Sequence, residues 1–196
     1  MRLFLISVAC LAALLGGRAE AREADLWQQL QQGGYVILMR HGTVDSFSRS
    51  TSPDADFEGC EGQYNLTELG RAQALVVGEF LRKRKVAIGG VLASPLCRTR
   101  DTARIAFGPY RVWEELEPFP EGEGPERTRR IEVVTKLIAG HVGRDNLILV
   151  THQPNIDALT LEIVEPATML VLKPNGRGGF VQVQKILAVD LVKPAP

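Results

Sequence analysis

Two side chains that can carry positive charge stand next to each other in this sequence. Arg40 and His41 come directly after the apolar run 35–39, which has the length of a buried strand. Like charges repel, so a fold accepts such a pair only where something negative lies beside it. The pair therefore predicts a binding position for an anion.

Two more side chains of this kind follow apolar segments. Arg98 comes a few residues after the run 91–93, and His152 comes two residues after the run 147–150. In a parallel sheet, ligands bind at the edge formed by the carboxyl ends of the strands. We therefore expect all four side chains to meet at one edge of one sheet.

The elements that must position these residues alternate between strand-like and helix-like segments. The predicted strands are 35–39, 91–93, 111–113, 147–150, 168–172 and 179–191. The predicted helices are 25–32, 67–81 with Thr67 as its cap, 95–107, 127–139 and a short one after Pro154. Residues 46–63 and 114–126 are predicted loops. This order indicates an α/β fold, a three-layer sandwich with a mostly parallel central sheet and helices on both faces.

Length and charge favour one globular domain. The chain has 196 residues and a formal net charge of zero, which gives no indication of a nucleic-acid partner. Any anion must therefore be bound by a local cluster of side chains.

The N-terminal segment has the features of a signal peptide. Arg2 precedes the apolar run 3–15, and Ala19-Glu20-Ala21 fits a cleavage site. The run is too short to span a bilayer comfortably, so we expect no stable membrane anchor. The prediction is a signal peptide over residues 1–21 and a single domain over 22–196, secreted or periplasmic.

Cleavage would leave two of the three cysteines. Cys10 lies in the predicted leader, while Cys60 and Cys97 remain in a protein expected in an oxidising compartment. A Cys60–Cys97 disulfide and two unpaired thiols both stay open at this point, because a sequence does not give distances.

Four ordered motifs over about residues 34–160 resemble the histidine phosphatase (phosphoglycerate-mutase-like) superfamily. The motifs are Arg40-His41-Gly42, Asn65-Leu66-Thr67-x-x-Gly70-Arg71-x-Gln73-Ala74, Ser94-Pro95-Leu96-x-Arg98-Thr99-x-x-Thr102-Ala103 and Val150-Thr151-His152. The leader, the chain length and the cysteine contexts are similar to the small secreted bacterial members. The resemblance implies a phosphoglycerate-mutase-like fold.

The resemblance also implies a phosphomonoesterase reaction. His41 would attack phosphorus and carry the phosphoryl group as a phosphohistidine. Arg40, Arg98 and His152 would hold the phosphate oxygens, so no metal or cofactor is required. The expected substrate is a small-molecule or cell-envelope phosphomonoester.

A phosphomonoesterase also needs a proton donor for the leaving group. The resemblance places this acid in the loop after the Arg98 helix, where Glu115 is the first candidate and Glu117 the second. The sequence departs from the family there, because Glu117-Pro118-Phe119-Pro120 replaces the usual aromatic-glycine ending. The alternative function is therefore a periplasmic module that binds a phosphorylated ligand without turnover.

Rival chemistries do not fit the spacing. A cysteine phosphatase loop on Cys97 would need an arginine six positions later, where Ala103 stands. A zinc site lacks paired cysteines or a histidine pair on a helix, and a Walker loop is absent. The third histidine, His141, is expected to be a capping or surface residue.

Overall fold

The computed structural model describes residues 25–45 and 59–192. The predicted signal peptide and most of the predicted 46–63 loop lie outside these residues. Within them, no helix is long and apolar enough to cross a membrane.

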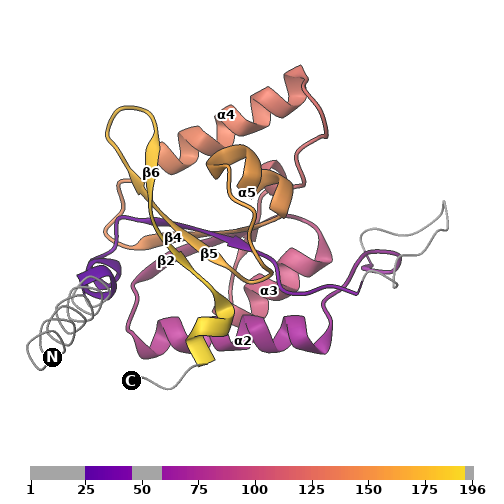
Figure 1. Cartoon of the computed structure of the whole chain (residues 1–196), viewed down its shortest axis with the longest axis horizontal. Helices are drawn as coiled ribbons and strands as arrows, with labels where there is room; N and C mark the ends of the chain where they lie inside the picture. The colour runs from indigo at the N-terminus through magenta and orange to yellow at the C-terminus, as the bar shows by residue number, and fades with distance from the viewer. Residues whose placement is uncertain (1–24, 46–58, 193–196) are drawn as a thin grey trace, which may run out of the picture.

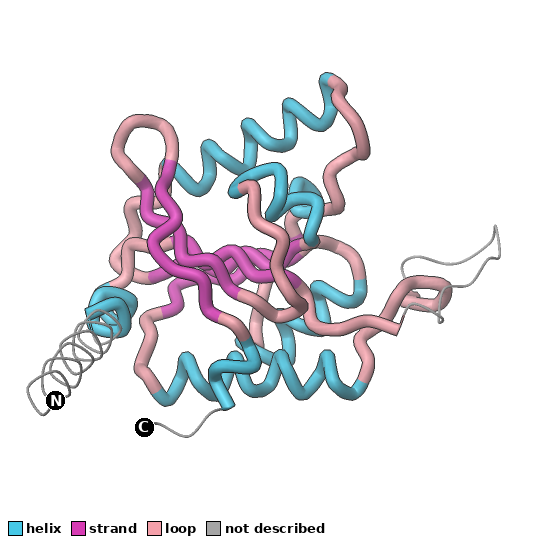
Figure 2. The backbone as a smooth tube through the Cα atoms, in the orientation of Figure 1, coloured by secondary structure: helices cyan, strands magenta, loops and turns pink. Residues whose placement is uncertain are grey.

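A β-sheet forms the centre of the protein (Figure 2). It has six strands in the order β3-β2-β4-β1-β5-β6. The strands are β1 Val36–Arg40, β2 Ile88–Ala93, β3 Arg111–Val112, β4 Asn146–Thr151, β5 Met169–Pro174 and β6 Phe180–Ile186. Neighbours among β3, β2, β4 and β1 pair in parallel, and β5 is antiparallel to both β1 and β6. The expected mostly parallel sheet is confirmed.

Helices cover both faces of the sheet (Figure 1). Helices α2 (Glu68–Lys83) and α3 (Cys97–Phe107) lie on one face, and α4 (Pro125–Ala139) and α5 (Gln153–Thr160) lie on the other. Residues 25–32 are helical as expected. The three-layer α/β arrangement predicted from the sequence is confirmed.

The apolar run of β1 contributes side chains to the hydrophobic core on both faces of the sheet. Ile37 and Met39 belong to the core cluster that includes residues of α2 and α3, while Val36 and Leu38 belong to the cluster with residues of α4 and α5. A strand buried on both faces needs apolar side chains at every position rather than at alternate ones. This requirement explains the continuous apolar run before Arg40.

The register of the parallel strands aligns their carboxyl ends. Arg40 is opposite Thr151, and Val150 is opposite Ala93. His41, Ser94 and His152 each follow one of these strands directly. The predicted meeting of strand ends at one edge is therefore confirmed.

Several element boundaries differ from the sequence predictions, among them those of β6 and α4. Strand β6 ends at Ile186, and a 3-10 helix, η2 (Ala188–Val192), replaces the rest of the predicted strand. Helix α4 begins at Pro125, inside the predicted loop. A proline fits the start of a helix because the first amide protons there need no partner within the helix.

A disulfide joins Cys60 to Cys97, with a Cα–Cα distance of 5.6 Å. Of the two possibilities left open by the sequence, the bridge is the one observed. Near it, the buried Gln63 side chain accepts a hydrogen bond from the Cys97 amide. These contacts hold the segment before α2 against the first turn of α3, directly before Arg98.

We predict that a Cys60→Ser/Cys97→Ser double variant is less stable than the wild type. The bridge spans 37 residues, and the lost loop-closure constraint on the unfolded chain amounts to about 4 kcal/mol. Urea unfolding of both proteins without reductant measures the difference.

Thiol alkylation provides a control for the same bridge. Native protein without reductant should show no label on either Cys60 or Cys97, and reductant in denaturant should expose both. Labelling of both cysteines in the native protein would contradict the disulfide.

Candidate active site

The structure brings the predicted basic side chains together at the carboxyl edge of the sheet. The rings of His41 and His152 have their centroids 5.3 Å apart. Arg98 donates from Nε to Nδ1 of His152 at 3.3 Å. Arg40 acts electrostatically on both histidines. All four residues thus belong to one cluster, contributed by β1, α3 and the turn after β4.

Backbone hydrogen bonds fix His41 in place. Its amide donates to Thr151 O at 3.0 Å, and its carbonyl accepts from the amide of Ala167 at 3.0 Å. Its ring Nδ1 lies 2.8 Å from the carbonyl oxygen of Gly42. Because a carbonyl only accepts, Nδ1 carries the proton in this contact and Nε2 keeps its lone pair. Nε2 is thus the nitrogen suited to nucleophilic attack.

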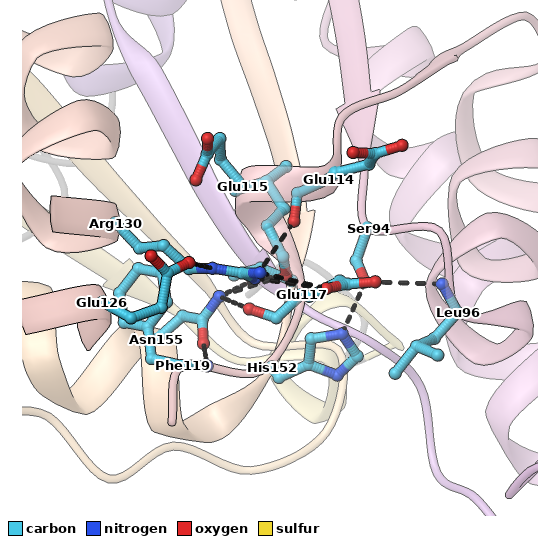
Figure 3. Close-up of polar contacts among 12 residues, drawn as sticks. Ser94, Leu96, Glu114, Glu115, Glu117, Phe119, Glu126, Arg130, His152 and Asn155 are labelled. Atoms are coloured by element: carbon cyan, nitrogen blue, oxygen red, sulfur yellow. Dashed lines mark hydrogen bonds and ion pairs between the residues drawn. The ribbon is translucent and has the colours of Figure 1, made fainter. Parts of the chain in front are cut away.

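His152 has the opposite tautomer. Since Nδ1 accepts from Arg98, the proton of the neutral ring is on Nε2, which donates to Ser94 Oγ at 2.8 Å (Figure 3). Ser94 follows β2 directly and is fully buried. Its hydroxyl holds the orientation of the His152 ring. The sequence motif contained Ser94, but sequence reasoning assigned it no role.

The two arginines are partly buried, and no carboxylate of the described residues is bonded to their guanidinium groups. Arg40 donates from Nη1 to the carbonyl of Val164, and its Nε is buried with no hydrogen-bond partner among the described residues. Burial lowers the pKa of both Arg40 and Arg98. The carboxyl of Glu165 partly offsets this effect on the pKa of Arg40, and Tyr64 does so for Arg98.

Both histidines are neutral near pH 7. The pKa of His41 is lowered from 6.5 to about 4, mainly by burial. The charges of Arg98 and Arg40 lower this pKa further, whereas the hydrogen bond to the Gly42 carbonyl raises it. Burial and the neighbouring charges of Arg98, His41 and Arg40 also lower the pKa of His152 well below its usual value. An uncharged imidazole is the nucleophilic form.

The turn after His41 is locked onto two helices. The Gly42 amide donates to Thr102 Oγ1 at 3.1 Å, and that hydroxyl donates to the carbonyl of Arg98 at 2.7 Å. A Cβ on Gly42 would lie 2.5 Å from Gly70 O of α2. The missing side chain of Gly42 therefore leaves room for this helix backbone.

The second motif holds the next residue of the same turn. Gln73 Oε1 accepts from both the amide and the hydroxyl of Thr43, at 2.9 and 3.0 Å. The predicted cap Thr67 donates from Oγ1 to Thr43 O and accepts from the Gly70 amide. The first three motifs of the sequence therefore meet around residues 41–43.

The structure does not bring Glu115 into contact with the four basic residues. Its carboxylate forms two hydrogen bonds with Arg129 of α4, at 2.8 and 3.0 Å. The carboxylate of Glu117 pairs with Arg130. In Figure 3 the Glu115 carboxylate extends away from the His152 ring. The assignment of Glu115 as proton donor stays a prediction.

Asn155 fastens this acidic loop to α5. Its Oδ1 accepts from the Phe119 amide at 2.7 Å, and its Nδ2 donates to the carbonyls of Leu116 and Glu117 and to the Thr151 hydroxyl (Figure 3). The side chain is fully buried. Sequence reasoning missed Asn155, and its position three residues after His152 was the available signal.

Residues 36–118 match the family described as histidine phosphatase superfamily (branch 1). Several solved structures share the fold. The protein histidine phosphatase SixA complexed with tungstate is 18% identical, with 80% of this chain and 99% of that chain covered and a TM-score of 0.58. Phosphoglycerate mutase from Thermus thermophilus is 18% identical, with 78% and 98% covered and a TM-score of 0.53.

A mycobacterial glucosyl-3-phosphoglycerate phosphatase solved with VO3 is 21% identical, with 72% of this chain and 93% of that chain covered and a TM-score of 0.50. No curated protein matches the chain in sequence. The family match over residues 36–118 agrees with the resemblance that the four sequence motifs indicated. The solved structures share the phosphoglycerate-mutase-like fold, and membership of the superfamily stays a prediction. The small secreted bacterial branch stays a prediction.

We predict that Gly70→Ala destabilises the protein. The new Cβ would lie 2.1 Å from Thr43 O, so either α2 or the turn after His41 must move. Such overpacking costs about 1–3 kcal/mol, measured by urea unfolding. Gly124→Ala is the control, because nothing lies within 4 Å of a Cβ built there. Equal stability of the two variants would contradict the close approach.

We also predict that His41 makes folding sensitive to mild acid. Its pKa is about 4 in the folded protein and about 6.5 in the unfolded chain. Between these values the unfolded state binds a proton that the folded state does not, so stability falls as the pH drops from 7 towards 4. For His41 the loss between pH 7 and 5 is about 2 kcal/mol.

The measurement is urea unfolding at both pH values for the wild type and for His41→Asn. The asparagine can keep a donor near Gly42 O without a titrating group, so the variant should lose about 2 kcal/mol less than the wild type. An identical pH dependence of the two proteins would contradict the depressed pKa.

Proposed function

We propose that the protein is a phosphomonoesterase that hydrolyses its substrate through a phosphohistidine on His41. The observation that carries the proposal is the arrangement of His41: a neutral ring, its Nδ1 proton directed to Gly42 O, beside Arg40 and Arg98. This arrangement leaves Nε2 free to attack while positive charge lies next to it.

The surrounding groups suit the oxygens of a phosphoryl group. Arginine stays charged when partly buried, and its planar fork matches phosphate geometry. The buried Arg40 Nε has no hydrogen-bond partner in the described part of the chain, and such a donor is costly unless an acceptor reaches it. His152 carries its proton on Nε2, so it would serve the phosphate as a positioned neutral ring.

Helix geometry adds to the positive potential. Helices α3 and α5 begin at Cys97 and Gln153, directly beside Arg98 and His152. The partial positive charge of the helix dipole at a helix N-terminus attracts anions. A phosphoryl group losing its bond to the leaving oxygen would be stabilised by this field and by the two arginines.

The similar structures agree with this reaction class. One is a protein histidine phosphatase with tungstate, and another is a glucosyl-3-phosphoglycerate phosphatase with VO3, both complexes with oxyanions. From these structures we infer only the class of substrate for this protein: a phosphate-bearing compound that is either a small molecule or a cell-envelope component. With the predicted leader, the reaction would take place in the periplasm or outside the cell.

A binding module without turnover is the second candidate. It is favoured by one observation: the predicted acids Glu115 and Glu117 are held by Arg129 and Arg130. If no other group handles protons at the site, the pocket would bind a phosphorylated ligand and release it unchanged.

An aryl phosphate assay separates the two candidates. Mature protein should release the aryl alcohol from 4-nitrophenyl phosphate, vanadate should inhibit the release, and His41→Ala should abolish it. Acid-free quenching after a single turnover should show one phosphoryl group on His41, detected by mass spectrometry.

The control is vanadate binding to His41→Ala, measured by calorimetry, which reports whether the pocket remains. Vanadate binding by the wild type without any His41-dependent release would establish the binding module and refute the esterase.

A further inference from the structure

The loop at residues 161–168 lies at the same edge of the sheet as His41. The loop connects α5 to β5. Because β5 is antiparallel to β1, β5 begins at the edge where β1 ends, and the loop that precedes β5 lies there too. The Arg40 amide donates to Thr168 O at 3.0 Å, which ties the end of the loop to the end of β1.

Contacts on both sides of Glu165 bind this loop to the basic cluster. The carbonyl of Val164 accepts from the Arg40 guanidinium, and the amide of Ala167 donates to His41 O at 3.0 Å. The Val164 amide also donates to the side chain of Gln153, the residue after His152. Glu165 therefore lies between two residues that contact Arg40 and His41 directly.

The carboxyl group of Glu165 is available for chemistry. The residue is exposed, and it forms no side-chain hydrogen bond or ion pair with the described residues. Its charge nevertheless acts on Arg40. Glu115 and Glu117 differ in this respect, since arginines of α4 hold their carboxylates.

We propose that Glu165 is the general acid and general base of the reaction, an inference that rests on the proposed phosphomonoesterase function. The loop 161–168 would present its carboxyl group to the leaving oxygen from the side of Arg40. Glu165 would thus take the role that the sequence pattern gave to Glu115.

Atoms and electrons balance in each of the two steps. In the first, the Nε2 lone pair of His41 forms the N–P bond, the P–O bond breaks, and the leaving oxygen keeps the electron pair and takes a proton from the Glu165 carboxyl. In the second, a water oxygen bonds to phosphorus, the N–P electron pair returns to Nε2, and the Glu165 carboxylate takes a proton from that water. Phosphate leaves, and both residues return to their starting states.

The test compares Glu165→Gln with the wild type on two substrates of different leaving-group acidity. A 4-nitrophenolate leaves without protonation, so the variant should still give a burst of one aryl alcohol per protein. Its steady-state rate should fall, because water attack on the phosphohistidine lacks its base. On an alkyl phosphate the rate of the burst itself should fall by about 100-fold, as expected for loss of a general acid.

Glu115→Gln and Tyr64→Phe are the comparison variants. Under the proposal, neither gives the pattern of a retained aryl burst with a lost alkyl burst. Vanadate binding by calorimetry shows that the pocket of each variant is intact.

Three results would overturn the inference. Glu165→Gln could keep wild-type rates on the alkyl phosphate, or lose both bursts equally with vanadate binding retained, or the discriminating pattern could come from Glu115→Gln or Tyr64→Phe. In each of these cases the aryl phosphate hydrolysis by the wild type leaves the proposed function standing. Absence of any His41-dependent hydrolysis would instead remove the proposed function and this inference together.

Discussion

Mutual repulsion among basic groups that are largely buried from water is the constraint that shapes this edge of the sheet. Arg40, His41, Arg98 and His152 lie together, and the histidines are almost fully buried. Four charges there would be costly, because burial weakens their solvation and the low dielectric strengthens their repulsion. The protein meets the constraint by keeping the two imidazoles neutral and leaving charge on the arginines alone.

Neutrality alone does not define a nucleophile, because a neutral imidazole has two tautomers. The neighbours of each ring make the choice. A backbone carbonyl accepts a hydrogen bond from the Nδ1 proton of His41. The Arg98 guanidinium donates to Nδ1 of His152, so this nitrogen carries no proton. The proton of His152 is therefore on Nε2, which donates to Ser94. Two histidines in one cluster thereby have different free atoms and would perform different tasks.

The sequence predicted the parts of this arrangement that depend on local pattern. The continuous apolar run of β1, the Thr67 cap and the order of strands and helices follow from burial on two faces and from hydrogen-bonding requirements at helix ends. The ion pair of Glu115 could not be predicted in this way. It depends on where α4 begins and which of its faces meets the acidic loop, and both follow from tertiary packing.

The reversed direction of β5 is the feature of topology with the greatest consequence for the site. A parallel strand beside β1 would begin at the far edge of the sheet, and its preceding loop would lie away from His41. The antiparallel strand instead brings residues 161–168 to the carboxyl edge, where their backbone accepts from Arg40 and donates to His41. These bonds fix the Arg40 guanidinium and the His41 backbone with main-chain atoms of the loop, which leaves the side chains of the loop free of that task. A loop held so firmly by its backbone can present, at a defined place, a carboxyl group that has no partner among the described residues. This separation of support from chemistry is what an acid–base residue requires.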